Sequence, residues 1–304
     1  MTRLEGMRRT LAAFVLTGLA AACTPSAPTE PDLSGPALEL LYAQTAYAIR
    51  SNGGLRTETV PADAPLSVDG LAKNFEEIAF FTEFSREGSG RLRGTREIRL
   101  IRWAEPVRVG VIFGDSVSAG QRATDMKDIK ALLAKYRKLT GLDVRYRPSG
   151  DVNYIVLVLE RAEQRALASA ILDQGDFPAA LAQDLWDSRP SLLCSASLFG
   201  PSEETGGIAV AVALVKAEHR GVMRTSCFHE EMTQALGLLN DSKRVRPSIF
   251  NDDEEFALLT LHDEILLRML YDPRLRVGMS AAEARPMLRQ IAMDAARASG
   301  AVIR

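Results

Sequence analysis

The chain has 304 residues and a formal charge of -2 at pH 7, from 39 acidic and 37 basic side chains. Hydrophobic residues make up 46% and charged residues 25%, a composition typical of a globular protein that buries a sizeable core. A chain with this charge has no broad basic field, which argues against nucleic acid or an anionic membrane surface as an electrostatic partner.

Residues 1–23 have the pattern of an export signal. Arginines precede an apolar run, and three alanines lead to Cys23, in a stretch too short to span a bilayer. Ala-Ala-Ala-Cys resembles a lipobox, whose cysteine becomes the lipid-modified first residue of the mature protein. Plain signal-peptidase cleavage is the alternative. Because Thr24 replaces the aspartate that retains lipoproteins at the inner membrane, the resemblance implies a lipid-anchored protein facing the periplasm from the outer membrane.

A tether and an N-terminal extension follow. Residues 24–33 are rich in proline, as in tethers that hold a domain away from a membrane. A helix is predicted from Ser34 to Gly53, because serine is a good N-cap and glycine ends helices. The rest of the extension, 34–99, contains Phe75–Phe81, an apolar run that the pattern does not divide between helix and strand.

Apolar periodicity predicts a domain of mixed sheet and helices in the next segment, which places the chain in the α/β (α+β) class. Solidly apolar or alternating runs predict strands at 103–113, 144–146, 154–159 and 208–215. Apolar residues at helical spacing predict helices at 125–139, 161–172 and 178–186.

Two cysteines, Cys194 and Cys227, remain after Cys23. Export to an oxidising compartment favours a disulfide between them. In the chain-entropy model, closing a loop of this length stabilises a fold by about 3–4 kcal/mol. Two buried thiols are the alternative.

The segment from His229 to Asp241 has two readings as a zinc-peptidase helix. Such a helix has the pattern H-E-x-x-H-x-x-G-x-x-H, which supplies three imidazole ligands, a general base and a turn. Read from His229, the His-Glu pair fits, but Thr233 and Leu239 stand at the other two ligand positions.

The reading that begins one residue later retains different parts of the pattern. Glu231 then occupies the general-base position and Gly237 the turn. The three ligand positions become Glu230, Gln234 and Asn240. In this register the helix resembles a zincin helix without its histidines.

The remaining sequence predicts two capped helices. Thr260 is followed three residues later by Asp263, and Ser280 by Glu283, which is the spacing of a capping box. Asn251 and the four acidic residues after it predict the cap and first turn of another helix, since their spacing is not that of a calcium loop.

Further motifs extend the resemblance to the metzincin family over roughly residues 100–272. Arg102–Val109 is similar to the R-W-x-x-P-[IV]-x-V strand of such domains, and Ser248–Asn251 resembles the Met-turn, with Phe250 in place of the methionine. Leu259–Tyr271 resembles the closing helix. The whole chain also resembles an uncharacterised bacterial family catalogued as a domain of unknown function.

The resemblance implies a zincin-like domain at 100–277, whose central helix bears a degenerate metzincin motif. The capping pattern at Ser280 predicts a C-terminal helix in the remaining segment, 278–304. In zincin-like domains the strand at 208–215 borders the substrate cleft. An exposed edge there would bind a peptide by strand addition. An ordinary edge strand is the alternative.

The donor atoms at the ligand positions are poor ones for zinc. Glu230, Gln234 and Asn240 supply one charged and two neutral oxygens, although Asp241 would add charge in place of Asn240. Without a metal, Glu231 has no bound water to activate. His229 points away from Gln234 on a helix, so we expect a packed histidine.

We therefore expect a cell-envelope lipoprotein without catalytic activity or bound cofactor, which binds a peptide or another envelope component through the retained cleft. The alternative is an active metallopeptidase or metallohydrolase that holds zinc or another divalent cation with atypical ligands. A structural lipoprotein without a ligand is the third interpretation.

Overall fold

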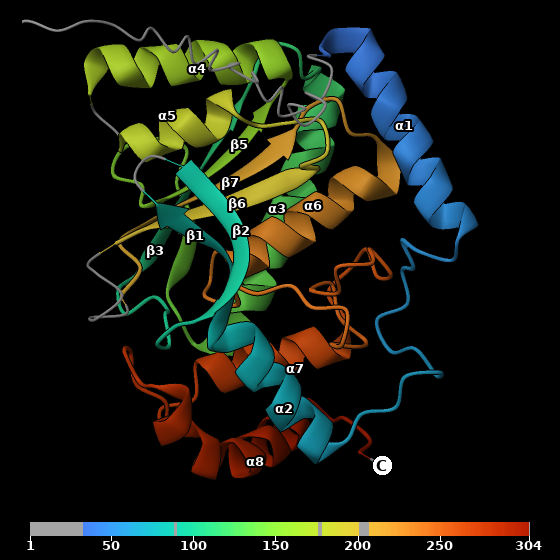
Figure 1. Ribbon diagram of the computed structural model, residues 1–304, viewed down its shortest axis with the longest axis vertical. Helices are drawn as coiled ribbons and strands as arrows, with labels where there is room; N and C mark the ends of the chain where they lie inside the picture. The colour runs from blue at the N-terminus through green and yellow to red at the C-terminus, as the bar shows by residue number, and fades with distance from the viewer. Residues whose placement is uncertain (1–32, 88–89, 176–177, 201–206, 304) are drawn as a thin grey trace, which may run out of the picture. The chain divides into compact units, whose positions relative to one another are not determined.

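A five-stranded mixed sheet lies at the centre of the structure (Figure 1). The structure is a computed structural model that describes residues 33–87, 90–175, 178–200 and 207–303. The strand order is β4-β3-β5-β7-β6, with β3 at Val107–Phe113, β4 at Val144–Tyr146, β5 at Tyr154–Leu159, β6 at Cys194–Phe199 and β7 at Val210–Lys216. Neighbouring strands are parallel except β6 and β7, which are antiparallel. The predicted mixed α/β class is confirmed.

Eight helices surround this sheet in the described part of the chain. They are α1 Gly35–Ser51, α2 Val68–Ala79, α3 Ala119–Thr140, α4 Arg161–Gln174, α5 Ala179–Trp186, α6 Gly221–Gln234, α7 Leu261–Leu270 and α8 Ala281–Ala298. None of these described helices is long and apolar enough to cross a bilayer. The predicted export signal with Cys23, and the tether up to residue 32, lie outside the described residues.

The two faces of the sheet bury alternate residues of the same strands, because side chains alternate along a strand. Val156 and Val158 of β5 join the main core with residues of α3 and α6. Ile155 and Leu157 point to the other face and pack with α4 and α5. Helices thus cover both faces of β5, which explains its unbroken apolar sequence.

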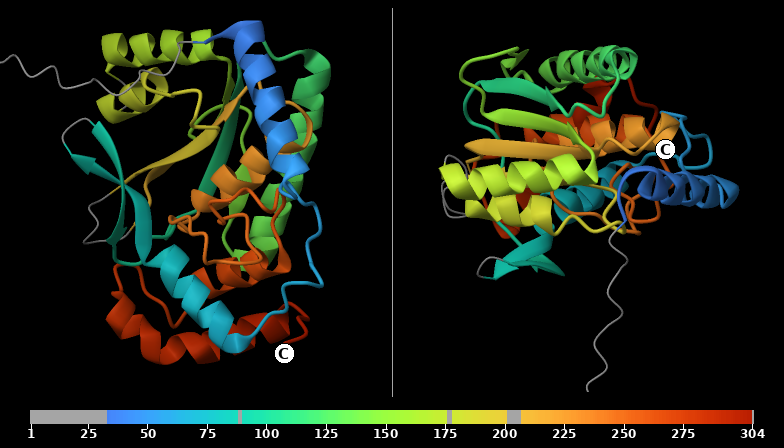
Figure 2. Two further views of the ribbon diagram at one scale, coloured as in Figure 1. Left: turned by 45° about the vertical axis from the view of Figure 1, so that its right-hand side comes forward. Right: turned by 90° about the horizontal axis from the view of Figure 1, so that it is seen from above.

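The helices α2, α7 and α8 form a layer beyond one end of the sheet (Figures 1 and 2). Phe75, Ile265 and Ile291 are fully buried and belong to the main core. The N-terminal extension and the C-terminal helix therefore share one compact unit with the sheet. Between α2 and β3, β1 (Phe81–Glu87) and β2 (Gly90–Glu97) form an antiparallel hairpin.

A buried ion pair joins α6 to α3. Nε of Arg224 lies 3.0 Å from Oδ1 of Asp125, and its Nη2 lies 2.6 Å from Oδ2. Nη1 of Arg224 also donates to the carbonyl of Ala217 at 3.0 Å, and Gln121 donates to Asp125 at 2.8 Å. These extra hydrogen bonds satisfy both charged groups where water cannot.

Aromatic side chains from three distant segments anchor the carboxyl end of α6. Tyr154 donates to the carbonyl of Met232 at 3.1 Å, and the Trp103 indole donates to Ala235 at 2.9 Å. Tyr271 donates to the carbonyl of Leu236 at 2.8 Å. A helix end exposes carbonyls without intrahelical partners, and these three donors satisfy them inside the core.

The carboxyl end of α6 leads into a turn that depends on Gly237. Its φ of 118° lies in the region that favours glycine. A Cβ at this position would lie 2.1 Å from the carbonyl oxygen of Ile101 and 3.3 Å from Leu270. The predicted turn at Gly237 is confirmed, and the close approach of two backbones excludes any side chain there.

Several predicted elements occur in the structure, and others differ from the prediction. The capping boxes at Thr260 and Ser280 are confirmed at the starts of α7 and α8. The run Phe75–Phe81 proves to be the end of a helix followed by the first residue of β1. The helix predicted at Asn251 is wrong, because Asn251 accepts a hydrogen bond from the backbone of Asp253 in a turn, and α7 begins only at Leu261.

The prediction of an edge strand at 208–215 is also wrong. The strand itself is present as β7, but β5 lies on one side of it and β6 on the other. The edge next to β7 is β6, which the sequence did not reveal because its residues, Cys-Ser-Ala-Ser-Leu-Phe, lack the unbroken apolar run of β5 and β7. Among the described strands, β6 pairs only with β7.

Candidate functional site

Four of the predicted site residues gather at the disulfide. Cys194 of β6 and Cys227 of α6 are bonded, which confirms the predicted bridge. A carboxylate oxygen of Glu230, one of Glu231 and the sulfur of Cys194 all lie within 4.8 Å of one another. In the described part of the chain, no other group of three or more histidine, cysteine or acidic side chains is this close.

This grouping arises because Cys227, Glu230 and Glu231 are spaced by three and four residues on one face of α6. A sulfur in a disulfide is not a thiolate, so Cys194 offers no strong metal donor in this state. Glu231 is almost fully buried, and Glu230 is partly exposed. The structure therefore brings the general-base position and the first ligand position together.

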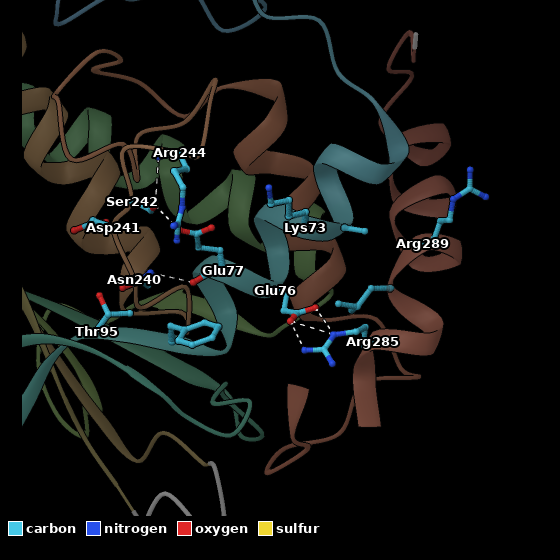
Figure 3. A pocket seen from close by; sticks show the side chains of 13 residues that line it. Lys73, Glu76, Glu77, Thr95, Asn240, Asp241, Ser242, Arg244, Arg285 and Arg289 are labelled. Carbon is cyan, nitrogen blue, oxygen red and sulfur yellow. Dashed lines mark hydrogen bonds and ion pairs between the residues drawn. The ribbon is translucent and has the colours of Figure 1, made fainter. Parts of the chain in front are cut away.

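Asn240, at the third ligand position, is bonded to α2 instead. Its backbone N–H donates to the carbonyl of Ile78 at 3.2 Å, and its Nδ2 donates to that of Glu77 at 3.1 Å (Figure 3). These contacts satisfy carbonyls at the carboxyl end of α2. Gln234, at the second ligand position, is the last residue of α6 and is mostly buried.

The register that begins at His229 does not form a site. Nδ1 of His229 accepts a hydrogen bond from the backbone N–H of Leu259 at 3.0 Å. Thr233, at its second ligand position, is fully buried and lies 2.9 Å from the hydroxyl of Tyr136. Both side chains therefore serve packing between α6 and its neighbours, as expected for His229.

The environment of His229 makes the stability of the fold depend on pH. Burial lowers the pKa of His229 from 6.5 to about 4, with a further contribution from the charge of Lys135. Between these values the unfolded chain binds a proton that the folded chain does not. Stability present above pH 6.5 is therefore lost as the pH falls toward 4.

We expect wild type to lose about 2 kcal/mol more unfolding free energy than His229→Gln between pH 7 and pH 4.5. Urea unfolding of both proteins at the two pH values measures this difference. His219, which burial also shifts to a pKa of about 4, is present in both proteins, so its contribution cancels. Equal losses in the two proteins would contradict the assignment.

Phe250, at the Met-turn position, is fully buried in the main core. The carboxylate of Asp263 holds the segment before it, accepting from the hydroxyl of Ser248 at 2.5 Å and from the backbone of Ile249 at 3.2 Å. The same carboxylate accepts from Thr260 at the start of α7. Asp263, the acidic residue of the capping box of α7, thus also orients the segment that resembles a Met-turn.

A groove with a volume of about 500 Å³ lies beside α2 (Figure 3). Its walls come from α2, the start of β1, β2, the segment after Asn240 and α8. Asp241 lines it together with Asn240, so the end of the degenerate motif faces this groove. The sequence did not reveal the groove, because residues from both ends of the chain form it.

A model for one protein family matches residues 69–290 and carries the description "Protein of unknown function (DUF2927)". The chain belongs to the DUF2927 family. A search of curated proteins found no match to the chain. The region shared with DUF2927 begins in α2 and ends in α8, so it includes the disulfide, the motif on α6 and the groove.

Proposed function

We propose that this DUF2927 protein is a cell-envelope lipoprotein whose zincin-like domain has lost its histidine ligands, and that it binds a peptide or another envelope component without cleaving it. The mixed sheet supports the zincin-like assignment, since β3, α3, β4 and β5 follow the strand, helix, strand, strand order of such domains. The export signal, with Cys23 at its end, supports the envelope location.

The proposal that the domain is not catalytic rests on one observation: residues at or beside the metal-ligand positions make other contacts. Asn240 is hydrogen bonded to α2, and the nearest sulfur to Glu230 and Glu231 is in a disulfide. A catalytic zinc site needs three strong protein donors and an open position for water. The donor atoms of Glu230, Gln234 and Asn240 do not make such a set.

The edge strand β6 offers a place for a peptide. It lies beside α6, to which its first residue is joined by the disulfide, and it stands last in the strand order of the sheet, next to β7. An extended peptide binds such an edge through backbone hydrogen bonds. This corrected position replaces the edge that the sequence placed at 208–215.

The alternative is a metal-dependent hydrolase. The close approach of the Glu230 and Glu231 carboxylates is the observation that favours it, since two such groups attract a divalent cation. In this alternative Glu231 is the general base, and zinc would lower the pKa of its bound water.

Metal content separates the two functions. The protein carrying Cys23→Ser, purified from the periplasm without chelator, is incubated with zinc, dialysed and analysed by mass spectrometry. We expect zinc far below one equivalent, and no cleavage of a mixed peptide library. About one equivalent of retained metal, lost in Glu230→Ala, together with chelator-sensitive cleavage that Glu231→Gln abolishes, would establish the hydrolase.

The lipid anchor at Cys23 has a separate test. Palmitate incorporation that Cys23→Ser does not remove would contradict lipid attachment at this residue.

A further inference from the structure

The groove beside α2 carries basic side chains on three of its walls. Lys73 extends from α2, Arg244 from the segment after Asn240, and Arg285 and Arg289 from α8 (Figure 3). These groups come from three parts of the chain that are distant in sequence. A volume of about 500 Å³ is in the range of sites that hold small ligands.

Three acidic side chains, Glu76, Glu77 and Asp241, line the groove, and the two glutamates pair with its arginines. Arg289 pairs with Asp69 outside the lining at 2.7 Å. Glu77 accepts from Nη2 of Arg244 at 2.6 Å, and Glu76 accepts from Nη2 of Arg285 at 2.6 Å. Both glutamates are less exposed than their arginines, whose side chains are 77% and 62% exposed. The pairs leave the guanidinium groups at the opening of the groove, with further donors for an incoming anion.

Lys73 provides a cation that the described residues leave available. Its ammonium group is exposed and makes no hydrogen bond or ion pair with any described residue. It stands one helical turn from Glu77 on the same face of α2, beside the Arg244 pair. Its charge acts on the nearby Glu77 carboxylate, but an anionic group in the groove would meet Lys73 without breaking a hydrogen bond or an ion pair.

Asn240 adds a hydrogen-bond acceptor at the same place. Its side chain is only 2% exposed, and its Oδ1 has no hydrogen-bond partner among the described residues. The hydrogen bond from Nδ2 to Glu77 decides which end of the amide is the oxygen. Because this oxygen is itself closed to solvent, a ligand N–H group reaches it only when neighbouring side chains shift, and it then recovers the free energy that a buried acceptor without a partner costs.

Ala72, Phe81 and Leu288 add apolar surface to the lining of the groove. We propose that the groove binds a short acidic peptide. Carboxylates of the peptide meet Lys73 and the arginines at the opening, a backbone N–H serves Asn240, and the carbon chains cover the apolar floor. A simple anion would use only the first of these features.

This inference goes beyond the proposed function because the cations that it uses, on α2, on the segment after Asn240 and on α8, lie outside the metal-ligand positions and outside the β6 edge. Its test is binding of an N-acetylated peptide of four glutamates, labelled for fluorescence anisotropy, to the protein carrying Cys23→Ser. A peptide of four lysines and free acetate are the comparison ligands. Metal content and cleavage do not enter this measurement, so its failure is distinguishable from failure of the proposed function.

Lys73→Glu is expected to weaken binding of the glutamate peptide by about tenfold, and Lys73→Gln by about threefold. Lys138→Glu makes the same change in net charge on the exposed face of α3 and is expected to alter affinity by less than about twofold. Melting temperatures of the variants confirm that each is folded.

Three results would overturn the proposal. The first is no binding of the glutamate peptide by wild type at low salt. The second is equal weakening by Lys73→Glu and Lys138→Glu, which would mean that net charge alone acts. The third is displacement of the peptide by acetate at equal carboxylate concentration, which would reduce the groove to a site for simple anions.

Discussion

Replacing Gly237 by alanine is expected to lower the free energy of unfolding by about 4 to 5 kcal/mol, near the upper end for single substitutions. The new Cβ would lie 2.1 Å from the carbonyl oxygen of Ile101, which belongs to the backbone and cannot rotate away. A φ of 118° adds strain for any side chain. Relief requires the end of α6 to separate from the segment that leads to Trp103, which would break the indole hydrogen bond to Ala235.

Gly120→Ala is the matched control. Gly120 lies in the first turn of α3, and a Cβ there would meet no atom within 4 Å. Alanine is expected to leave stability unchanged or to raise it by up to about 1 kcal/mol. Urea unfolding of both variants at pH 7 gives the comparison. If Gly237→Ala unfolds within about 1 kcal/mol of wild type, the turn accommodates a side chain, contrary to the geometry.

Replacing Arg224 by methionine is expected to destabilise the fold by about 3 to 5 kcal/mol. The guanidinium and the Asp125 carboxylate have side chains that are 3% and 2% exposed. Loss of the arginine leaves the carboxylate buried, with the amide of Gln121 still donating to it. It also removes the donor to the carbonyl of Ala217, which precedes α6.

Arg220→Gln provides the control for this prediction. Arg220 pairs with Glu39 at 2.9 Å, but their side chains are 57% and 43% exposed, so its loss is expected to cost less than about 1 kcal/mol. The double variant Arg224→Met with Asp125→Leu is expected to be more stable than Arg224→Met alone, since no uncompensated charge remains. A double variant that loses the sum of two large single effects would contradict this account.

Patterns within a short stretch of sequence predicted the local structure well. The apolar run of β5 marks a strand buried on both faces, and the capping boxes at Thr260 and Ser280 mark the starts of α7 and α8. These features depend on hydrogen bonds and burial within a few residues. The disulfide was also predictable, because only two cysteines remain after the export signal.

Predictions failed where one local pattern serves two structures. Asn251 and its acidic neighbours fit a helix start and a turn equally well, and packing against the N-terminal part decides for the turn, as the backbone bond from Leu55 to Glu254 shows. The edge was assigned to the strand at 208–215 because, in the zincin-like domains that the sequence resembles, this strand borders the substrate cleft. The neighbours of a strand depend on chain segments far away, and β6 takes the edge.

In the candidate site, too, some features follow from the sequence and others only from the tertiary structure. The sequence alone determined that Glu230 and Glu231 lie side by side on one helix and that a turn occurs at Gly237, since helix periodicity and glycine conformation are local properties. Only the tertiary structure decided that the sulfur of Cys194 lies close to the carboxylates of Glu230 and Glu231, and that Asn240 is hydrogen bonded to α2.

The groove beside α2 could not be predicted from the sequence either, although the sequence contains every charged residue that lines it. Its walls meet because apolar residues of α2, α7 and α8 bury one another in the main core. Burial of apolar surface is not directional, so a sequence can specify which faces are apolar without specifying which face meets which. Long-range packing made that choice and thereby placed Lys73, Arg244 and Arg285 around one opening.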